Sequence, residues 1–255
     1  MGALDGKIAL VTGSTRGLGR ITAEWLARDG AGIIVSGREA AAVDQAVTEI
    51  TALGGQAWGI PADLARIADA HHLATTALET VPQIDILVNN AGMSIRGNFW
   101  DVTDADWEYQ VNVNYRSPFI LAQHIAKQMI ERGIEGRIVN TSTIGARACH
   151  TNAAVYDSAK GAVETMTRNM AYELAPHGIC VNCVVPGAIP DRPGANRNFD
   201  ADKRAQYIRH IPIGRAGRAE DIAAAVRFFC RPESSFTTGQ SLLIDGAHST
   251  YLPEF

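Results

Sequence analysis

The sequence predicts an α/β protein: a single domain built on a doubly wound parallel sheet of seven strands, flanked by helices on both faces. Two observations support this prediction. Short apolar runs of strand length alternate with helix-length segments along the whole chain. A glycine-rich turn joins the first apolar run to the first helical segment. Such alternation is typical of βαβ units, in which a helix carries the chain back to start the next parallel strand.

The expected strands are short runs of mainly aliphatic residues between segments of helical character. In chain order they are Lys7–Thr12, Gly32–Ser36, Gln56–Ile60, Ile84–Val88, Gly136–Thr141, Gly178–Val185 and Ser241–Ile244.

The helical segments carry apolar residues at helical spacing. In the first segment Leu18, Ile21 and Trp25 fall on one face, and Gly30 supplies a stop signal. A long segment at about 154–175 repeats the pattern. The most irregular stretch, at about 188–210, follows the sixth strand, where a lid over a ligand is expected.

Length and composition exclude several classes of protein. A chain of 255 residues with 46% apolar and 20% charged residues suits one large globular domain. The net charge of −4 and the lack of a basic stripe make nucleic acid an unexpected partner. No apolar run reaches membrane-spanning length, and a strand-like run begins by Lys7, before a signal peptide could fit. We therefore expect a cytoplasmic protein.

The cysteines invite a redox or metal interpretation that the local pattern does not favour. The chain has four of them, Cys149, Cys180, Cys183 and Cys230, too few for a disulfide scaffold. Cys180 and Cys183 form a C-x-x-C within a strand-like run, and their separation of three points the thiols to opposite faces. We expect buried structural thiols and no metal site.

A glycine-rich turn is the first candidate binding element. Residues 12–19 read Thr-Gly-Ser-Thr-Arg-Gly-Leu-Gly, directly after the first strand and at the start of the first helix. Glycines let the backbone approach a pyrophosphate, and the free amides at a helix start attract it. The placement between strand and helix makes a dinucleotide site a stronger interpretation than an ordinary turn.

A tyrosine and a lysine form the candidate catalytic pair. Tyr156 and Lys160 lie four residues apart, so a helix stacks them on one face. An ammonium beside a phenol lowers the phenol's pKa below its reference of about 10. A phenol tuned in this way can donate and accept a proton near neutral pH. The same spacing is common on helix surfaces and alone establishes nothing.

Together these motifs resemble the short-chain dehydrogenase/reductase family. The resemblance rests on the TGxxxGxG turn, on Asn-Asn-Ala-Gly at 89–92, on Tyr-x-x-x-Lys, and on the closing segments Thr238–Gln240 and Asp245–Gly246. The motifs occur in the family's order and span essentially the whole chain. The resemblance implies a Rossmann-like fold, a nicotinamide cofactor, and interconversion of a carbonyl and a secondary alcohol.

The end of the second strand indicates which nicotinamide cofactor is used. NAD enzymes of this type usually place an acidic residue there, whereas this chain has Gly37 followed by Arg38. With Arg16 in the glycine turn, two guanidiniums suit a 2′-phosphate and favour NADP(H). The resemblance implies that the cofactor contacts are Gly13, Ser14, Thr15, Arg16, Gly17, Leu18, Gly19, Arg38, Asp63, Leu64, Asn90, Ala91, Gly92, Tyr156, Lys160, Pro186, Gly187 and Ile189.

The resemblance also implies the catalytic roles. Tyr156 is the general acid or base, Lys160 lowers its pKa, and Asn114 supports a water linked to the lysine. The family's serine hydroxyl, about thirteen residues before the tyrosine, falls on Thr143 by counting, with Ser142 as the alternative. Threonine keeps the hydroxyl as donor and acceptor, so we favour Thr143 and leave Ser142 open.

The substrate is less well defined. The pocket is expected from 93–96, 145–151 and the lid segment, which include Arg96, Arg147, Arg192, Arg197 and His150. Family analogues imply a small ketone, a keto ester, a sugar, sugar acid or polyol, or a 3-ketoacyl thioester. Against the thioester, Tyr172 falls where carrier-protein reductases often have an arginine.

Two further alternatives concern function and assembly. A non-catalytic NADP-binding regulator would keep the glycine turn, but such proteins tend to lose the tyrosine or the lysine, and both are present. The resemblance implies a homotetramer, or a homodimer, assembled through helices at about 107–132 and 154–175.

Overall fold

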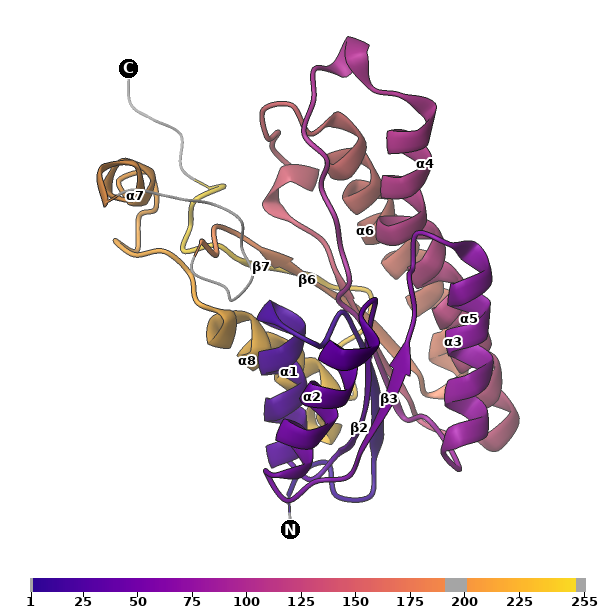
Figure 1. The fold of residues 1–255 in the computed structure, drawn as a ribbon. Coiled ribbons are helices and arrows are strands. Elements are labelled where there is room, and N and C mark those ends of the chain that lie inside the picture. Colours follow the sequence, from indigo (N-terminus) through magenta and orange to yellow (C-terminus); the bar gives the residue numbers. More distant parts are fainter. Residues whose placement is uncertain (1, 191–200, 251–255) are drawn as a thin grey trace.

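The computed structural model describes residues 2–190 and 201–250, and within these ranges a single parallel sheet of seven strands forms the centre of the molecule (Figure 1). The strand order is β3-β2-β1-β4-β5-β6-β7. All seven strands predicted from the sequence are confirmed, with no end shifted by more than two residues. Their bounds are β1 Ile8–Thr12, β2 Gly32–Gly37, β3 Ala57–Pro61, β4 Ile86–Asn89, β5 Arg137–Thr141, β6 Cys180–Pro186 and β7 Ser241–Ile244.

Helices cover both faces of the sheet, so the doubly wound, Rossmann-like fold is confirmed. Helices α1 (Gly17–Arg28), α2 (Ala40–Thr51) and α8 (Ala219–Cys230) pack on one face. Helices α3 (Ile67–Thr80) and α5 (Ser117–Arg132) pack on the other, together with α6 (Ala154–Leu174). The predicted lid contains α7 (Ala201–Ile208), and its residues 191–200 lie outside the described part of the chain.

The strand sequences explain why two layers of helices are needed. In β1, Ala9 and Val11 join the core under α1 and α8, whereas Ile8 and Leu10 join the core under α3 and α5. Successive side chains of a strand point to opposite faces. An unbroken aliphatic run therefore presents an apolar surface on both sides, and helices must bury both.

The topology fixes where a ligand can bind. Strand β1 pairs with β2 on one side and with β4 on the other, so the connections leave β1 and β4 in opposite directions. The loops that follow the carboxyl ends of these two strands separate and leave a crevice between them. The glycine turn follows β1 and the Asn-Asn-Ala-Gly segment follows β4, so both motifs face this crevice.

The predicted helix at 107–132 is observed as two helices joined by a wider turn. Helix α4 (Asp104–Val111) passes through a π turn (Asn112–Arg116) into α5. A π turn adds a residue to the helical repeat and is frequent at functional sites. Its effect here is to place Asn114 under the segment that follows β4, as shown below.

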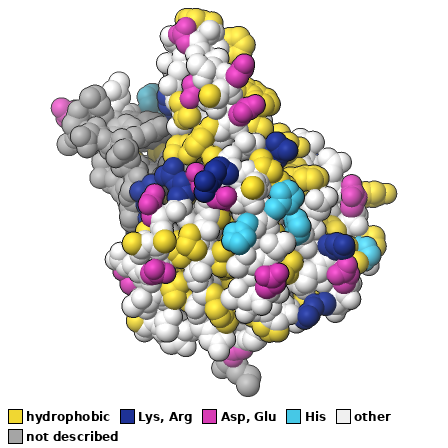
Figure 2. All heavy atoms as spheres, turned by 45° about the vertical axis from the view of Figure 1, so that its right-hand side comes forward, with side chains coloured by type: hydrophobic (Ala, Val, Ile, Leu, Met, Phe, Trp, Pro, Cys, Tyr) yellow, Lys and Arg dark blue, Asp and Glu magenta, His cyan; other side chains and the backbone are white. Residues whose placement is uncertain are grey.

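Three of the four cysteines are buried and none forms a disulfide. Cys180 and Cys183 are buried free thiols, as predicted from their place in a strand, and burial raises the pKa of Cys183 to about 12. On the face seen in Figure 2, acidic and basic side chains are interspersed, and histidines gather over α3 and α5, where His71 contacts His124. Among the described helices, none combines the length and apolarity needed to cross a bilayer.

Candidate active site

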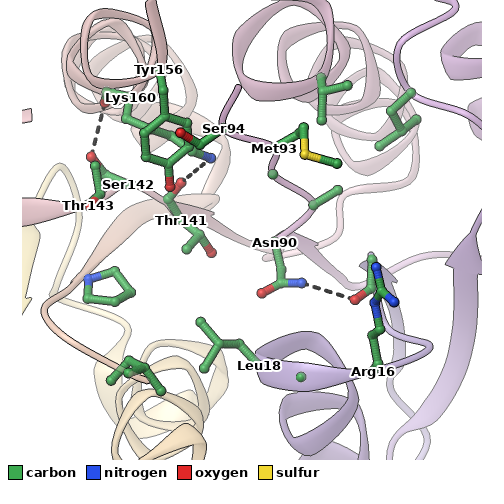
Figure 3. A pocket seen from close by; sticks show the side chains of 18 of the residues that line it. Arg16, Leu18, Asn90, Met93, Ser94, Thr141, Ser142, Thr143, Tyr156 and Lys160 are labelled. Carbon is green, nitrogen blue, oxygen red and sulfur yellow. Dashed lines mark hydrogen bonds between the residues drawn. The ribbon is translucent and has the colours of Figure 1, made fainter. Parts of the chain in front are cut away.

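A cavity of about 710 Å³ lies at the carboxyl ends of the strands (Figure 3). Tyr156 and Lys160 reach it from α6, and Arg16 and Leu18 lie across from them. Most site residues predicted from the sequence line it. They are Gly13, Thr15, Arg16, Gly17, Leu18, Arg38, Asp63, Leu64, Asn90, Ala91, Gly92, Ser142, Thr143, Tyr156, Lys160, Pro186, Gly187 and Ile189. Ser14, Gly19 and Asn114 lie behind this lining and contact its residues instead.

The glycine turn is held against the segment after β4. Asn90 Nδ2 donates to Thr12 O (2.9 Å), and Thr12 Oγ1 accepts from the backbone N–H groups of Asn90 and Ala91 (3.0 Å each). A Cβ at Gly13 would lie 3.0 Å from Ala91 Cα, and one at Gly19 would overlap Gly13 O and Asn90 Nδ2. Only glycine lets these two segments meet so closely.

The first turn of α1 has the properties of an anion site. It contains no acidic residue, and its N-cap, Arg16, makes no side-chain cap to the helix amides. The uncapped N–H groups and the helix dipole favour a negative group at this end. The close-packed glycines and this bare helix start fit the pyrophosphate of a dinucleotide.

The end of β2 adds positive charge next to this turn. Gly37 and Arg38 line the cavity together with Arg16, and the Arg38 guanidinium donates to Tyr109 Oη (3.2 Å). Asp63, after β3, is held in place from both sides, since its N–H donates to Asp69 and its carboxylate accepts from Ala65 N. These contacts fix the cavity wall at the ends of β2 and β3.

The Tyr156–Lys160 pair lies at the opposite wall, on the face of α6 that meets the strand ends. Lys160 is 2% exposed, its Nζ donates to Thr141 O (2.8 Å), and it lies 6.0 Å from the centre of the Tyr156 ring. Desolvation lowers the pKa of Lys160 to about 8, and the coulombic effect of Cys183 acts in the opposite direction. The ammonium charge is therefore placed next to the phenol in a site with little water to screen it.

Asn114 positions the backbone beside the lysine. It is fully buried in the π turn, where its Oδ1 accepts from Met93 N (3.1 Å) and its Nδ2 donates to Met93 O (2.7 Å). This holds Gly92 close to Lys160: a Cβ on Gly92 would lie 3.4 Å from Lys160 Nζ and 3.2 Å from Asn114 Oδ1. Asn114 thus touches the protein segment that lines the cavity.

The two candidate hydroxyls differ in their surroundings. Ser142 Oγ lies 3.0 Å from both Lys160 O and Glu164 Oε1, so its single proton is donated within the protein. Thr143 Oγ1 accepts a long hydrogen bond from Gly145 N (3.4 Å), and an acceptor role leaves its own proton for another partner.

The other residues predicted to form the substrate pocket do not all line the cavity. Arg96 and His150 line the cavity. Arg147 forms an ion pair with Glu164 (2.9 Å) and is not part of the lining. Arg192 and Arg197 lie outside the described residues.

Sequence reasoning missed several lining residues. Tyr109 and Val113 enter from α4 and the π turn, and no motif marks them because their position depends on how α4 packs. Ala62 and Thr141 could have been identified from the sequence, because Ala62 directly precedes Asp63 and Thr141 ends the fifth predicted strand.

The sequence of this chain matches one family model and several curated proteins. A family model described as enoyl-(acyl carrier protein) reductase matches residues 13–248. A 3-oxoacyl-acyl-carrier-protein reductase from Synechocystis sp. is 34% identical over 96% of this chain and 98% of its own length. An L-xylulose reductase from Mesocricetus auratus is 35% identical over 95% and 96%.

A solved structure supports the same grouping. The blue fluorescent protein from a metagenomic library, in complex with NADPH, superposes with a TM-score of 0.89 at 32% identity and covers 96% of this chain and 99% of that one. Family model, relatives and structure all span nearly the entire molecule. The chain therefore belongs to the short-chain dehydrogenase/reductase family of oxidoreductases, which act on CH–OH and C=O groups with a nicotinamide cofactor.

Proposed function

We propose that this protein is an NADP(H)-dependent oxidoreductase that interconverts a carbonyl and a secondary alcohol, with Tyr156 as the general acid and base. The observation that carries the proposal is the buried Lys160 ammonium, 6.0 Å from the Tyr156 ring centre, in the same cavity as the glycine turn. A phenol in this position can exchange a proton with a molecule bound in the cavity.

The roles follow from what each residue contacts. When bound, the nicotinamide supplies or accepts the hydride at the carbonyl carbon. In reduction Tyr156 gives its proton to the carbonyl oxygen, and in oxidation it takes that proton back. Lys160 favours the phenolate through its charge. Thr143 donates its hydroxyl proton to the same oxygen and stabilises the developing negative charge. Asn114 is a positioning residue that acts through Met93 and Gly92.

The preference for NADP(H) is proposed from charge. Arg38 lines the cavity at the end of β2 together with Arg16 of the glycine turn, and Gly37 supplies no carboxylate at that strand end to repel a phosphate. Each charge-assisted hydrogen bond contributes roughly 1.5–3 kcal/mol, which gives a preference of order a hundredfold. That a similar solved protein binds NADPH is consistent with this proposal.

The substrate range is a small ketone, a keto ester, a sugar or polyol, or a 3-ketoacyl thioester. The relatives named as xylulose and oxoacyl reductases fall in two of these classes. The alternative, a regulator that binds NADP without turnover, would show cofactor binding but no oxidation of NADPH across a panel of such carbonyls.

The decisive experiment removes one oxygen atom. Tyr156→Phe is expected to lower kcat at least a thousandfold with NADPH affinity within about threefold of wild type, measured by steady-state kinetics and fluorescence titration. Unchanged turnover in this variant would refute the proposal.

A pair of variants distinguishes the two candidate hydroxyls. Thr143→Ala should lower kcat more than Ser142→Ala, and the reverse order would assign the role to Ser142.

We also propose a cytoplasmic homotetramer, or a homodimer. Phe119 on α5 and Tyr172 on α6 are 45% and 85% exposed. Contact with a second copy of the chain would bury this apolar surface. Light scattering would give the mass directly, and a monomer at micromolar concentration would refute the assembly.

A further inference from the structure

The cavity wall next to Tyr156 is built from two loops that are bonded to each other. Arg96, in the segment after β4, donates from its guanidinium to Thr151 O (2.6 Å), and Gly97 N donates to Asn152 O (3.1 Å). Arg96 and His150 both line the cavity. The two loops therefore present an arginine and a histidine together at the Tyr156 end of the site.

The histidine is held in one orientation. Asp157, on α6 directly after Tyr156, accepts from His150 N (2.8 Å) and contacts His150 Nδ1 (2.9 Å). An ionised carboxylate only accepts, so Nδ1 is the donor and Nε2 is left for the cavity. A Cβ at Gly145 would overlap both partners. The lack of a side chain at position 145 therefore leaves the space that the His150–Asp157 pair occupies.

The charges around the cavity differ between its two ends. Within the described lining, the basic residues are Arg16, Arg38, Arg96 and Lys160, and Asp63 is the acidic one. Arg16, Arg38 and Asp63 belong to the cofactor wall. Asp157 is not part of the described lining, and its carboxylate accepts from the backbone N–H and the ring Nδ1–H of His150. Among the described lining residues, Arg96 is therefore the cation on the substrate side that has no acidic neighbour, and its guanidinium retains further donors after bonding Thr151.

We propose that the substrate is a hydroxylated acid, with its carboxylate bound by Arg96 and a hydroxyl donating to His150 Nε2. This substrate class rests on the proposed carbonyl–alcohol activity and narrows it. An arginine binds a carboxylate through two parallel N–H donors, whereas an imidazole nitrogen whose ring partner is fixed by an aspartate accepts from a hydroxyl. Aldonic acids and their oxo forms carry both groups on a chain short enough for the cavity.

The first test compares acids with matched neutral polyols. D-Gluconate, D-mannonate and D-galactonate are each assayed against the corresponding alditol with NADP⁺, and their dissociation constants are measured by calorimetry on the NADP⁺-loaded protein. At least one aldonate is expected to exceed its alditol by tenfold or more in both kcat/KM and affinity. Arg96→Gln should lower this ratio roughly tenfold to a hundredfold. Arg168→Gln, an exposed arginine on α6 outside the cavity lining, should leave it unchanged.

The second test isolates the histidine. His150→Leu is expected to raise KM for the aldonate about tenfold with little change in kcat, and His150→Gln should restore part of the loss because its amide oxygen accepts a hydroxyl. A purely structural role would lower stability and kcat for every substrate alike, and thermal unfolding of each variant measures that contribution.

The outcomes separate the inference from the proposed function. If the wild-type protein reduces neutral ketones but shows no acid preference, or if Arg96→Gln keeps the preference, the substrate class is wrong and the activity stands. If no carbonyl or alcohol is turned over, the proposed activity is wrong. Calorimetry still decides the inference in that case, because aldonate binding that depends on Arg96 supports it and equal binding of the alditol overturns it.

Discussion

The two ends of the cavity are built by different means. At the cofactor end, the glycine turn and the end of β2 come from consecutive elements of one βαβ unit, and a backbone hydrogen bond from Ser14 N to Ser36 O (3.0 Å) joins them. At the substrate end, the wall depends on side-chain contacts between loops far apart in sequence, such as Arg96 with Thr151 and His150 with Asp157. Local backbone packing specifies the first end, and a few exchangeable side chains specify the second. We therefore expect substitutions of the turn glycines to abolish cofactor binding, and substitutions of single side chains at either end to change preference.

The largest effect is expected where backbone segments touch. Gly19→Ala adds a Cβ that overlaps Gly13 O and Asn90 Nδ2, so the glycine turn must move away from the segment after β4. We expect NADPH affinity to fall by more than a hundredfold and the free energy of unfolding to fall by about 1–3 kcal/mol. Fluorescence titration and chemical denaturation measure the two losses. Wild-type affinity in this variant would show that the turn is less constrained than its packing indicates.

A smaller effect is expected where cofactor choice depends on a side chain. Gly37→Asp introduces the carboxylate of an NAD enzyme, but its Cβ would lie 2.6 Å from Thr15 Cγ2. The single variant is therefore expected to lose NADPH affinity and to gain little for NADH. Adding Thr15→Ser removes the methyl group, and the double variant should prefer NADH by roughly tenfold or more. Equal kcat/KM ratios for the two cofactors in wild type and double variant would contradict this account.

This contrast also explains how much the sequence could predict. The seven strands, the glycine turn and the helix of Tyr156 and Lys160 follow from local patterns of apolar residues and glycines. The π turn that buries Asn114 against Met93 and the Asp157 contact that orients His150 depend on how helices pack. Neither leaves a periodic signal in the sequence. The sequence places His150 near the pocket, but only the contact with Asp157 gives its ring a defined orientation.

Lys160 lies between the two ends of the cavity. Burying its charge, which the proposed activity requires, should lower the stability of the folded protein. The unfolded chain keeps the lysine proton to a pKa of 10.5, whereas the folded protein releases it near 8 because burial disfavours the charge. Between these values the unfolded state binds more protons, so stability rises with pH, and below pH 8 the penalty is complete. The difference corresponds to roughly 3 kcal/mol, and loss of the bond to Thr141 O offsets about 1 kcal/mol.

Lys160→Met is therefore expected to be inactive but more stable than wild type by about 1–2 kcal/mol at pH 7. The gap should narrow as the pH rises from 8 towards 10.5, as measured by denaturant unfolding at several pH values. A variant less stable than wild type at pH 7, or a gap that widens with pH, would contradict the burial of a charged lysine.

The smallest effect is expected at an exposed thiol of the substrate end. Cys149 precedes His150 and is exposed, whereas Cys180, Cys183 and Cys230 are buried, and burial raises the pKa of Cys183 and of Cys230 to about 12. A thiol reagent should therefore modify one equivalent in the native protein, and Cys149→Ser should abolish this reaction with turnover preserved. Because the adduct lies beside the His150 wall, it should raise KM for the carbonyl a few-fold and leave KM for NADPH unchanged. An equal rise in both would mean that the substrate wall and the cofactor wall are mechanically coupled, and the independence of the two ends would have to be abandoned.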